Sequence, residues 1–172
     1  GGVGLAALLG AHAAGARQIV AIDRLDDKLE RAFALGATHV FNADDPDLVA
    51  QVRAATNGGV EYAIEAASSV DALEVAYRIT RRGGTTVTCS LPHPDHRFNL
   101  QAVNLVAEER TIKGCYLGSA VPARDIPHYI ALYHAGKLPV DKLITSRIRL
   151  DEINAGFDRL AAGEAVRQVI VF

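Results

Sequence analysis

The sequence contains no methionine and no tryptophan, and only two cysteines. Because methionine is absent, we expect that Gly1 is not a translation start and that the chain is a fragment of a longer protein or a processed piece. The cysteines, Cys89 and Cys115, form neither a Cys-x-x-Cys pair nor a cluster with histidine. This spacing excludes a disulfide framework and a cysteine-based zinc site.

Long apolar runs and a strong charge of either sign are also missing. No stretch approaches the roughly 18 to 20 apolar residues of a membrane span, and the alanine-rich start lacks the basic region and cleavage site of a signal peptide. The net charge is only −2, so nothing favours nucleic acid as a partner. With 49% hydrophobic and 22% charged residues, we expect a globular, cytoplasmic protein.

Short β-branched runs alternate with segments whose apolar residues recur at helical spacing. The strand-like runs are residues 18–22, 38–41, 60–64, 85–90 and 111–117. The helix-like segments are residues 5–14, 26–35, 47–55, 70–80 and 100–107. The alternation indicates right-handed βαβ crossovers, and therefore an α/β fold with a doubly wound parallel sheet and helices on both faces.

The pattern changes after about Leu117, where a proline-containing stretch begins. The expected elements of this tail are a helix over 126–135, a strand over 147–150, a helix over 151–163 and a strand-like run over 166–172. We interpret the tail as a departure from the βαβ alternation. It predicts a domain boundary at residue 117, with one domain over 1–117 and the next over 118–172.

The chain begins with a glycine-rich turn, GGVG, directly before the first predicted helix. Gly1 and Gly4 match the second half of the dinucleotide fingerprint G-x-G-x-x-G, whose first glycine would lie two positions before Gly1. A pyrophosphate that rests on backbone N–H groups at a helix N-terminus needs a turn without Cβ atoms. An ordinary glycine-rich turn is the alternative interpretation.

Asp23 follows the strand-like run QIVAI, 19 residues after Gly4. A carboxylate at this place can accept hydrogen bonds from the adenosine ribose hydroxyls, and it would repel the 2′-phosphate of NADP. The pattern therefore predicts NAD as the cofactor. Two alternatives stay open, since Arg24 could bind a 2′-phosphate and Asp23 could be a cap beside the next helix.

Six segments follow one another in a recognisable order along the chain. They are GGVGLAALLGAHAAGARQIVAIDRLDDKLERAFALGAT, GGVEYAIEAAS, RRGGTTVTCSLP, ERTIKGCYLGS, LITSRIRLDEINAGFDRL and GEAVRQVIVF. Together they closely resemble zinc-dependent, medium-chain alcohol dehydrogenases over essentially the whole chain. The resemblance implies a Rossmann domain that binds NAD, truncated at its start, over 1–117, and the end of the catalytic domain over 118–172.

The resemblance also implies which residues contact NAD. Those expected to line the pyrophosphate are Gly1, Gly2, Val3, Gly4 and Arg167. Those expected to hold the adenosine ribose are Asp23 and Lys28. Those expected beside the nicotinamide, through backbone groups, are Cys89, Ser90, Leu91 and Leu117.

Several of these residues also fit purely structural roles. Without the resemblance, Lys28 is typical of a surface charge, Cys89 of a buried strand thiol and Arg167 of a strand-edge charge. His93 and His96 have a spacing that could hold a metal, but no third ligand lies near them in the sequence. Glu65 ends a predicted strand at the ligand-bearing edge of the sheet, where it would help to order the nearby site; Ser68 or Ser69 would cap the next helix.

The reaction that the resemblance implies is zinc-assisted hydride transfer between an alcohol, or an aldehyde–thiol adduct, and NAD. In this family the zinc ligands precede the glycine motif, so we expect no catalytic residue and no metal ligand here, and an inactive chain on its own. The alternatives are another medium-chain enzyme, such as a polyol dehydrogenase or a zinc-free reductase, and a non-catalytic nucleotide-binding module. A Cys, a His-Glu pair and a second Cys ahead of the motif would identify the zinc enzyme.

Two expectations concern folding and assembly. In a sheet of order 3-2-1-4-5-6 the strand ahead of GGVG is central, and without it the neighbouring strands lack a ladder partner. We therefore expect that residues 1–172 do not fold alone. By the family resemblance, the run from Glu109 to Leu117 would be an edge strand that pairs with a second copy, which predicts a homodimer or homotetramer.

Overall fold

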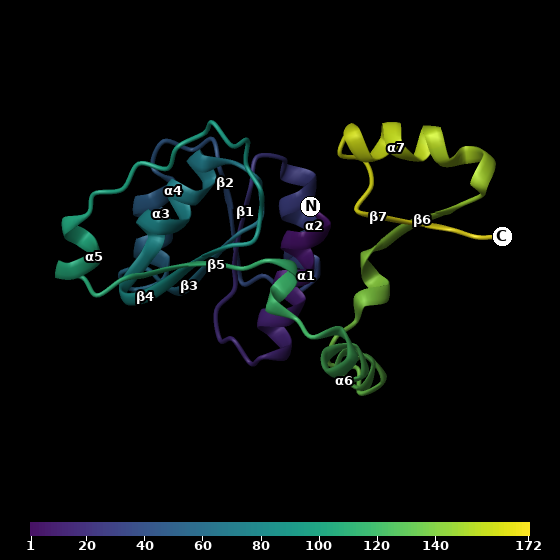
Figure 1. The fold of residues 1–172 in the computed structure, drawn as a ribbon, viewed down its shortest axis with the longest axis horizontal. Helices are drawn as coiled ribbons and strands as arrows, with labels where there is room; N and C mark the ends of the chain where they lie inside the picture. Colours follow the sequence, from purple (N-terminus) through teal and green to yellow (C-terminus); the bar gives the residue numbers. More distant parts are fainter.

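The computed structural model describes all 172 residues and alternates strands with helices along the chain (Figure 1). The α-helices are α1 (Gly2–Ala13), α2 (Asp26–Ala34), α3 (Leu48–Ala55), α4 (Val70–Ile79), α5 (Val103–Ala107), α6 (Pro122–His134) and α7 (Ile153–Ala161). The strands are β1 (Val20–Asp23), β2 (His39–Asn42), β3 (Val60–Glu65), β4 (Thr80–Thr88), β5 (Thr111–Gly114), β6 (Ile144–Ile148) and β7 (Arg167–Ile170). Three short 3₁₀ turns are η1 (Leu117–Ser119), η2 (Val140–Leu143) and η3 (Leu150–Glu152).

All strand pairs are parallel. Strands β1 and β2 form one pair, and β3, β4 and β5 form a separate sheet in that order. No ladder joins β1 to β3. This division agrees with the doubly wound order 3-2-1-4-5-6 when the strand expected ahead of GGVG is counted as strand 1. On that count β1 and β2 are strands 2 and 3, β3 is strand 4, and strand 1 lies between β1 and β3. The predicted α/β fold with parallel strands is confirmed.

Strand β4 begins five residues earlier than the β-branched pattern predicts. Val60 pairs with Thr80, and the register then shifts so that Tyr62 lies opposite Thr85. The buried hydroxyls of Thr80 and Thr86 hydrogen bond across this irregular stretch at 2.8 Å. The glycines between them hide the strand from a reading based on β-branched residues alone.

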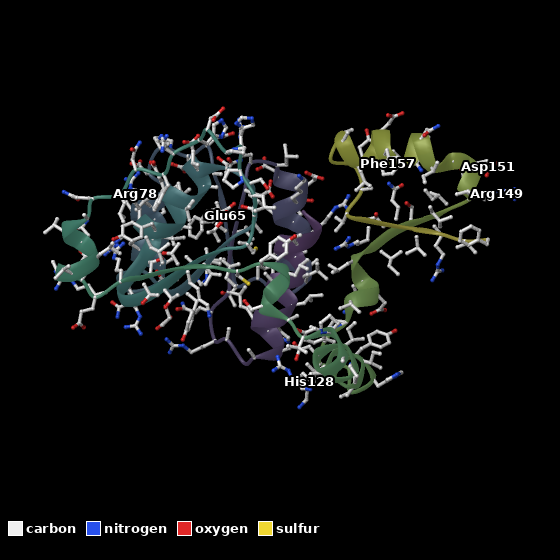
Figure 2. The ribbon with its side chains drawn as sticks, in the orientation of Figure 1. Glu65, Arg78, His128, Arg149, Asp151 and Phe157 are labelled. Carbon is white, nitrogen blue, oxygen red and sulfur yellow. The ribbon has the colours of Figure 1, made fainter.

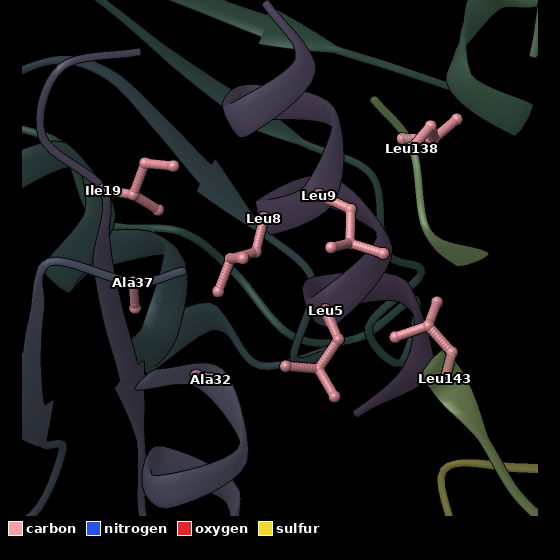
Figure 3. Close-up of a cluster of buried hydrophobic side chains, with 8 residues drawn as sticks. All are labelled: Leu5, Leu8, Leu9, Ile19, Ala32, Ala37, Leu138 and Leu143. Atoms are coloured by element: carbon pink, nitrogen blue, oxygen red, sulfur yellow. The ribbon is translucent and has the colours of Figure 1, made fainter. Parts of the chain in front are cut away.

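Two buried apolar clusters hold the helices in place. The first consists of Leu5, Leu8, Leu9, Ile19, Ala32, Ala37, Leu138 and Leu143 (Figure 3). The second, around α3 and α4, consists of Leu48, Val52, Ala63, Ala76 and Ile79. Because the first cluster includes Leu138 and Leu143, the segment after α6 is anchored to α1, whose N-terminus carries the glycine turn.

The tail forms one more βαβ unit. Strands β6 and β7 pair in parallel, with α7 between them in the sequence, so the prediction that the tail departs from the alternation is wrong. Figure 1 shows this unit beside α1 and α2, on the side away from α5. The domain boundary at residue 117 stays a prediction. No helix combines the length and apolar character that crossing a membrane requires.

Candidate cofactor-binding site

The N-terminus of α1 leaves backbone N–H groups free for a ligand. Gly1 is the N-cap, and its carbonyl accepts the first helical hydrogen bond from the Leu5 N–H at 3.0 Å. No side chain caps this end, so the N–H groups of the first turn have no partner within the helix. A Cβ added at Gly1 or Gly4 would meet no atom within 4 Å. The turn is therefore open to a bulky anion.

Arg167, at the start of β7, lies against this turn. A Cβ added at Gly2 would lie 3.4 Å from the Arg167 Nε and 3.5 Å from its Cζ. The guanidinium forms no ion pair with any carboxylate of the chain, whereas several other arginines do. The fold thus brings together a helix N-terminus and a free cation from residues 165 positions apart, a combination that suits phosphate oxygens.

Asp23 lies beside the same turn, and Lys28 lies beside the turn before β7. Asp23 ends β1, and its Oδ2 is 3.9 Å from the Gly1 nitrogen. Its Oδ1 accepts a hydrogen bond from the Leu25 N–H at 3.2 Å, so the carboxylate is held in one orientation. The Lys28 Nζ lies 3.7 Å from where a Gly163 Cβ would be, which places Lys28 next to the turn before β7.

Arg24 points to a carboxylate other than Asp23. Its Nε lies 2.9 and 3.2 Å from the two carboxylate oxygens of Asp44. The Asp44 N–H in turn donates to the Asn42 side chain at 2.9 Å. The sequence does not predict this ion pair, because no local pattern indicates which acidic residue pairs with an arginine 20 positions away.

The second group of predicted residues lies at the carboxyl ends of β4 and β5. Cys89, Ser90 and Leu91 follow β4, and the Cys115 N–H donates to the Thr88 carbonyl at 2.9 Å, extending the β4–β5 ladder. Leu91 and Leu117 are 77% and 79% exposed, so their apolar side chains have no cover within the chain. These residues therefore offer an apolar surface next to backbone groups at one edge of the sheet.

Glu65 is buried at the end of β3 and ties this edge together (Figure 2). Its Oε2 accepts hydrogen bonds from the Thr88 hydroxyl at 2.6 Å and the Ser90 hydroxyl at 2.5 Å. Its Oε1 accepts the Ala67 N–H at 2.6 Å. Burial alone would raise the pKa of Glu65, but these hydrogen bonds outweigh it and hold the pKa below its ordinary value. The carboxylate is therefore ionised at neutral pH.

The thiol of Cys89 is engaged rather than free. Its Sγ donates to the Glu65 carbonyl at 3.1 Å, and the Cys89 N–H donates to the same oxygen at 3.0 Å. Burial, the Glu65 charge and Cys115 raise the pKa of this thiol. A neutral thiol is a poor nucleophile and a poor metal ligand, which leaves the backbone as the part of Cys89 that could serve a ligand.

No part of the chain fits a metal ion. His93 and His96 lie close together, with ring centroids 5.6 Å apart, and both are exposed. No group of three or more His, Cys, Asp or Glu side chains is placed to hold a metal anywhere in the 172 residues. Structural zinc takes four ligands and catalytic zinc takes three from protein, so the residues present do not fit zinc.

Comparison with known proteins places this arrangement in a family. The model of a family described as zinc-binding dehydrogenase matches residues 2–135. Alcohol dehydrogenase 1 of Oryza sativa subsp. indica is 38% identical over an alignment of 173 positions, which covers 99% of this chain and 45% of that protein. Geraniol dehydrogenase of Castellaniella defragrans is also 38% identical, over an alignment that covers 100% of this chain and 46% of that protein.

Solved structures agree with the sequence relatives. Benzyl alcohol dehydrogenase from Acinetobacter calcoaceticus superposes with a TM-score of 0.93 at 34% identity, over 98% of this chain and 46% of that one. An alcohol dehydrogenase zinc-binding domain protein from Burkholderia ambifaria gives the same TM-score at 30% identity, over 98% of this chain and 45% of that one. The chain spans about half the length of the relatives it matches. The chain therefore belongs to the zinc-binding dehydrogenase family.

Proposed function

We propose that this chain is the NAD-binding part of an alcohol dehydrogenase, in which hydride passes between an alcohol carbon and the nicotinamide ring. The observation that carries the proposal is the meeting of Gly2, Asp23 and Arg167 at the N-terminus of α1. Three groups of the right chemistry for a dinucleotide come there from the start, the first strand and the last strand of the chain. Membership of the dehydrogenase family and the names of the relatives support the same assignment.

In this proposal the pyrophosphate lies on the first turn of α1. The free N–H groups of Gly2, Val3 and Gly4 donate to its oxygens, and the helix dipole favours its negative charge. Arg167 contributes a full positive charge beside Gly2. Because Arg167 has no carboxylate partner in the chain, none has to be displaced when the phosphate binds.

The adenosine ribose lies between Asp23 and Lys28. The Asp23 carboxylate accepts hydrogen bonds from the ribose hydroxyls, and Lys28 donates from the following helix. Arg24 pairs with Asp44, and this exposed ion pair opposes contact of Arg24 with a 2′-phosphate only weakly. This arrangement favours NAD over NADP.

The nicotinamide lies at the carboxyl edge of β4 and β5. Backbone groups of Cys89, Ser90, Leu91 and Leu117 bind its carboxamide, and the exposed leucine side chains exclude water from one side of the ring. Leu117 adopts a left-handed φ of 48°, which turns the chain at this position. None of these side chains performs the chemistry, so the chain supplies no catalytic residue.

Zinc enters this proposal only through residues outside the chain. No group of side chains here fits the metal, so the assignment of zinc-assisted transfer needs three ligands from elsewhere in the protein. We propose a small alcohol, or the corresponding aldehyde, as the substrate. The outer edge of β5 pairs with no other strand of the chain, and we propose that it pairs with a second copy to form a homodimer or homotetramer.

The test is cofactor binding to the protein at its natural full length. Arg167→Gln should weaken NAD binding by about ten- to a hundredfold, because hydrogen bonds to charged groups contribute about 1.5–3 kcal/mol. Arg147→Gln is the matched control, since Arg147 is an exposed arginine on the neighbouring strand β6. Calorimetry with NAD measures both. An unmodified protein that does not bind NAD, or an Arg167 variant that binds it as tightly, would refute the proposal.

A further inference from the structure

Glu65 is the only charged residue among those that are buried. It accepts hydrogen bonds from two separate segments of the chain, the turn after β3 and the exit of β4. The carbonyl of the same residue accepts the N–H and the thiol of Cys89. Glu65 therefore fixes the position of the segment that carries Ser90, and it does so from inside the molecule.

The charge of Glu65 also decides the direction of the hydrogen bond with Ser90. An ionised carboxylate only accepts hydrogen bonds, and a serine hydroxyl has a single hydrogen to donate. The Ser90 Oγ lies 2.5 Å from the Glu65 Oε2, so that hydrogen points inward to Glu65. What remains on the Oγ of Ser90, a half-buried residue, is its lone pairs. The side chain of Ser90 can therefore offer a ligand an acceptor and no donor.

We propose that Glu65 is a positioning residue that makes Ser90 an obligate acceptor for the carboxamide amino group of NAD. The inference rests on the proposed function, which places the nicotinamide beside residues 89–91. The carboxamide carries one N–H₂ group and one carbonyl oxygen, and an acceptor on the protein distinguishes the first from the second. The pair Glu65 and Ser90 thus selects both the ring substituent and its orientation.

The experiment compares three probes on the full-length protein. NADH carries the carboxamide, its 3-acetylpyridine analogue keeps the carbonyl but lacks the amino group, and ADP-ribose lacks the ring. The unmodified protein should bind NADH about three- to tenfold more tightly than the acetylpyridine analogue, which corresponds to one neutral hydrogen bond. ADP-ribose reports on the adenosine half of the site alone.

Two variants remove the proposed interaction in different ways. Glu65→Gln keeps the shape but can donate to the Ser90 Oγ, so the direction of the hydrogen bond is no longer fixed. Ser90→Ala removes the acceptor. Each should lower the preference for NADH over the analogue by the contribution of this one hydrogen bond, to the level that the backbone contacts alone supply, while leaving the dissociation constant of ADP-ribose within about twofold. The double variant should lose no more than either single variant, because both act through one contact.

Two control variants separate this role from a structural one. Glu61→Gln changes an exposed glutamate on the same strand, whose partner is Arg81, and should alter none of the three dissociation constants. Thr88→Val removes another hydrogen bond to the Glu65 carboxylate. It should lower the melting temperature without changing the preference for NADH over the analogue, since the bond to Ser90 persists.

The outcomes distinguish the inference from the function on which it rests. Binding of NADH and its analogue with equal affinity by the unmodified protein, or a preference that neither variant lowers, overturns the inference and leaves the function standing. Failure of the unmodified protein to bind NADH overturns both. Should Glu65→Gln not fold, as loss of ADP-ribose binding would reveal, the Ser90→Ala variant alone decides.

Discussion

Replacing Asp23 by asparagine should reverse much of the preference for NAD over NADP. Asn keeps the shape of Asp23 and can still accept a hydrogen bond from a ribose hydroxyl, but it removes the negative charge. The carboxylate is oriented by the Leu25 N–H and lies beside the Gly1 nitrogen. The substitution therefore changes the charge at a defined place and little else.

The expected size follows from two effects. Hydrogen bonds to a charged acceptor contribute about 1.5–3 kcal/mol and neutral ones about 0.5–1.5, so NAD should lose roughly 1–2 kcal/mol, or about five- to thirtyfold in affinity. A 2′-phosphate about 5 Å from a carboxylate is repelled by roughly 1–3 kcal/mol per unit charge at this partly exposed position. Relief of that repulsion adds to the first effect, and the ratio of NADP to NAD affinity should rise at least about thirtyfold.

Calorimetric titration of the full-length protein with NAD and with NADP measures this ratio. Asp27→Asn is the control, since Asp27 is an exposed acid in the first turn of α2. Adding Asp44→Asn to release Arg24 should increase NADP affinity by no more than about fivefold, because exposed ion pairs contribute only about 0–1 kcal/mol. A ratio that stays within threefold of the unmodified protein after Asp23→Asn would refute the role given to this carboxylate.

Three further predictions concern stability. The pKa of folded Glu65 lies below its ordinary value of 4.5, so the ionised carboxylate stabilises the protein above about pH 4.5, and this stabilisation is lost as the pH falls through the lowered pKa. The melting temperatures of the unmodified protein and of Glu65→Gln should therefore converge as the pH is lowered from 7 to 3. A difference in melting temperature that stays constant would contradict this prediction. Gly59→Ala should lower the free energy of unfolding, measured by denaturant titration, by at least about 2 kcal/mol. Gly59 has a φ of 130°, and a Cβ there would lie 2.5 Å from the Ile79 carbonyl oxygen. Gly10→Ala, in α1, is the control: a Cβ there meets no atom within 4 Å, and the substitution should raise the free energy of unfolding by about 0.5–1 kcal/mol. Residues 1–172 expressed alone should show no cooperative thermal transition, because only 23 of 172 residues are buried and the two sheets of the first part share no ladder; a sharp transition with NAD binding would disprove it.

The alternation of strands and helices could be predicted from the sequence because it depends on local periodicity. Apolar spacing, β-branched runs and glycine positions act within a few residues of one another, and they place β1 to β3 and α1 to α4 nearly where the structure has them. The parallel pairing follows from the alternation itself. The strand, helix and strand of the tail were predicted close to where they lie, but their parallel pairing was not, because the proline-containing helix α6 and the 3₁₀ turn η2 interrupt the alternation before β6.

The candidate site also has a part that the local sequence pattern predicts and a part that it does not. Gly1 to Gly4 and Asp23 stand in a motif with fixed spacing, which the residues alone indicate. The contact of Arg167 with Gly2 joins the two ends of the chain, and only a resemblance to a family could point to it beforehand. The ion pair of Arg24 with Asp44 and the hydrogen bond of Ser90 to Glu65 depend on side-chain geometry across strand ends. No local sequence pattern predicts such contacts.

The two halves of the proposed site differ in how the protein holds them. The adenosine half rests on a helix terminus and on side chains at the surface, such as Asp23 and Arg167, so its interactions are electrostatic and should weaken as salt rises. The nicotinamide half rests on backbone at the ends of strands, tied by the buried carboxylate of Glu65, where salt screens little. Raising the ionic strength should therefore weaken ADP-ribose and NAD in parallel and leave the contribution of the nicotinamide unchanged. In the proposed arrangement that contribution depends instead on the buried carboxylate of Glu65, so Glu65→Gln should lower it by the same factor at low and at high salt.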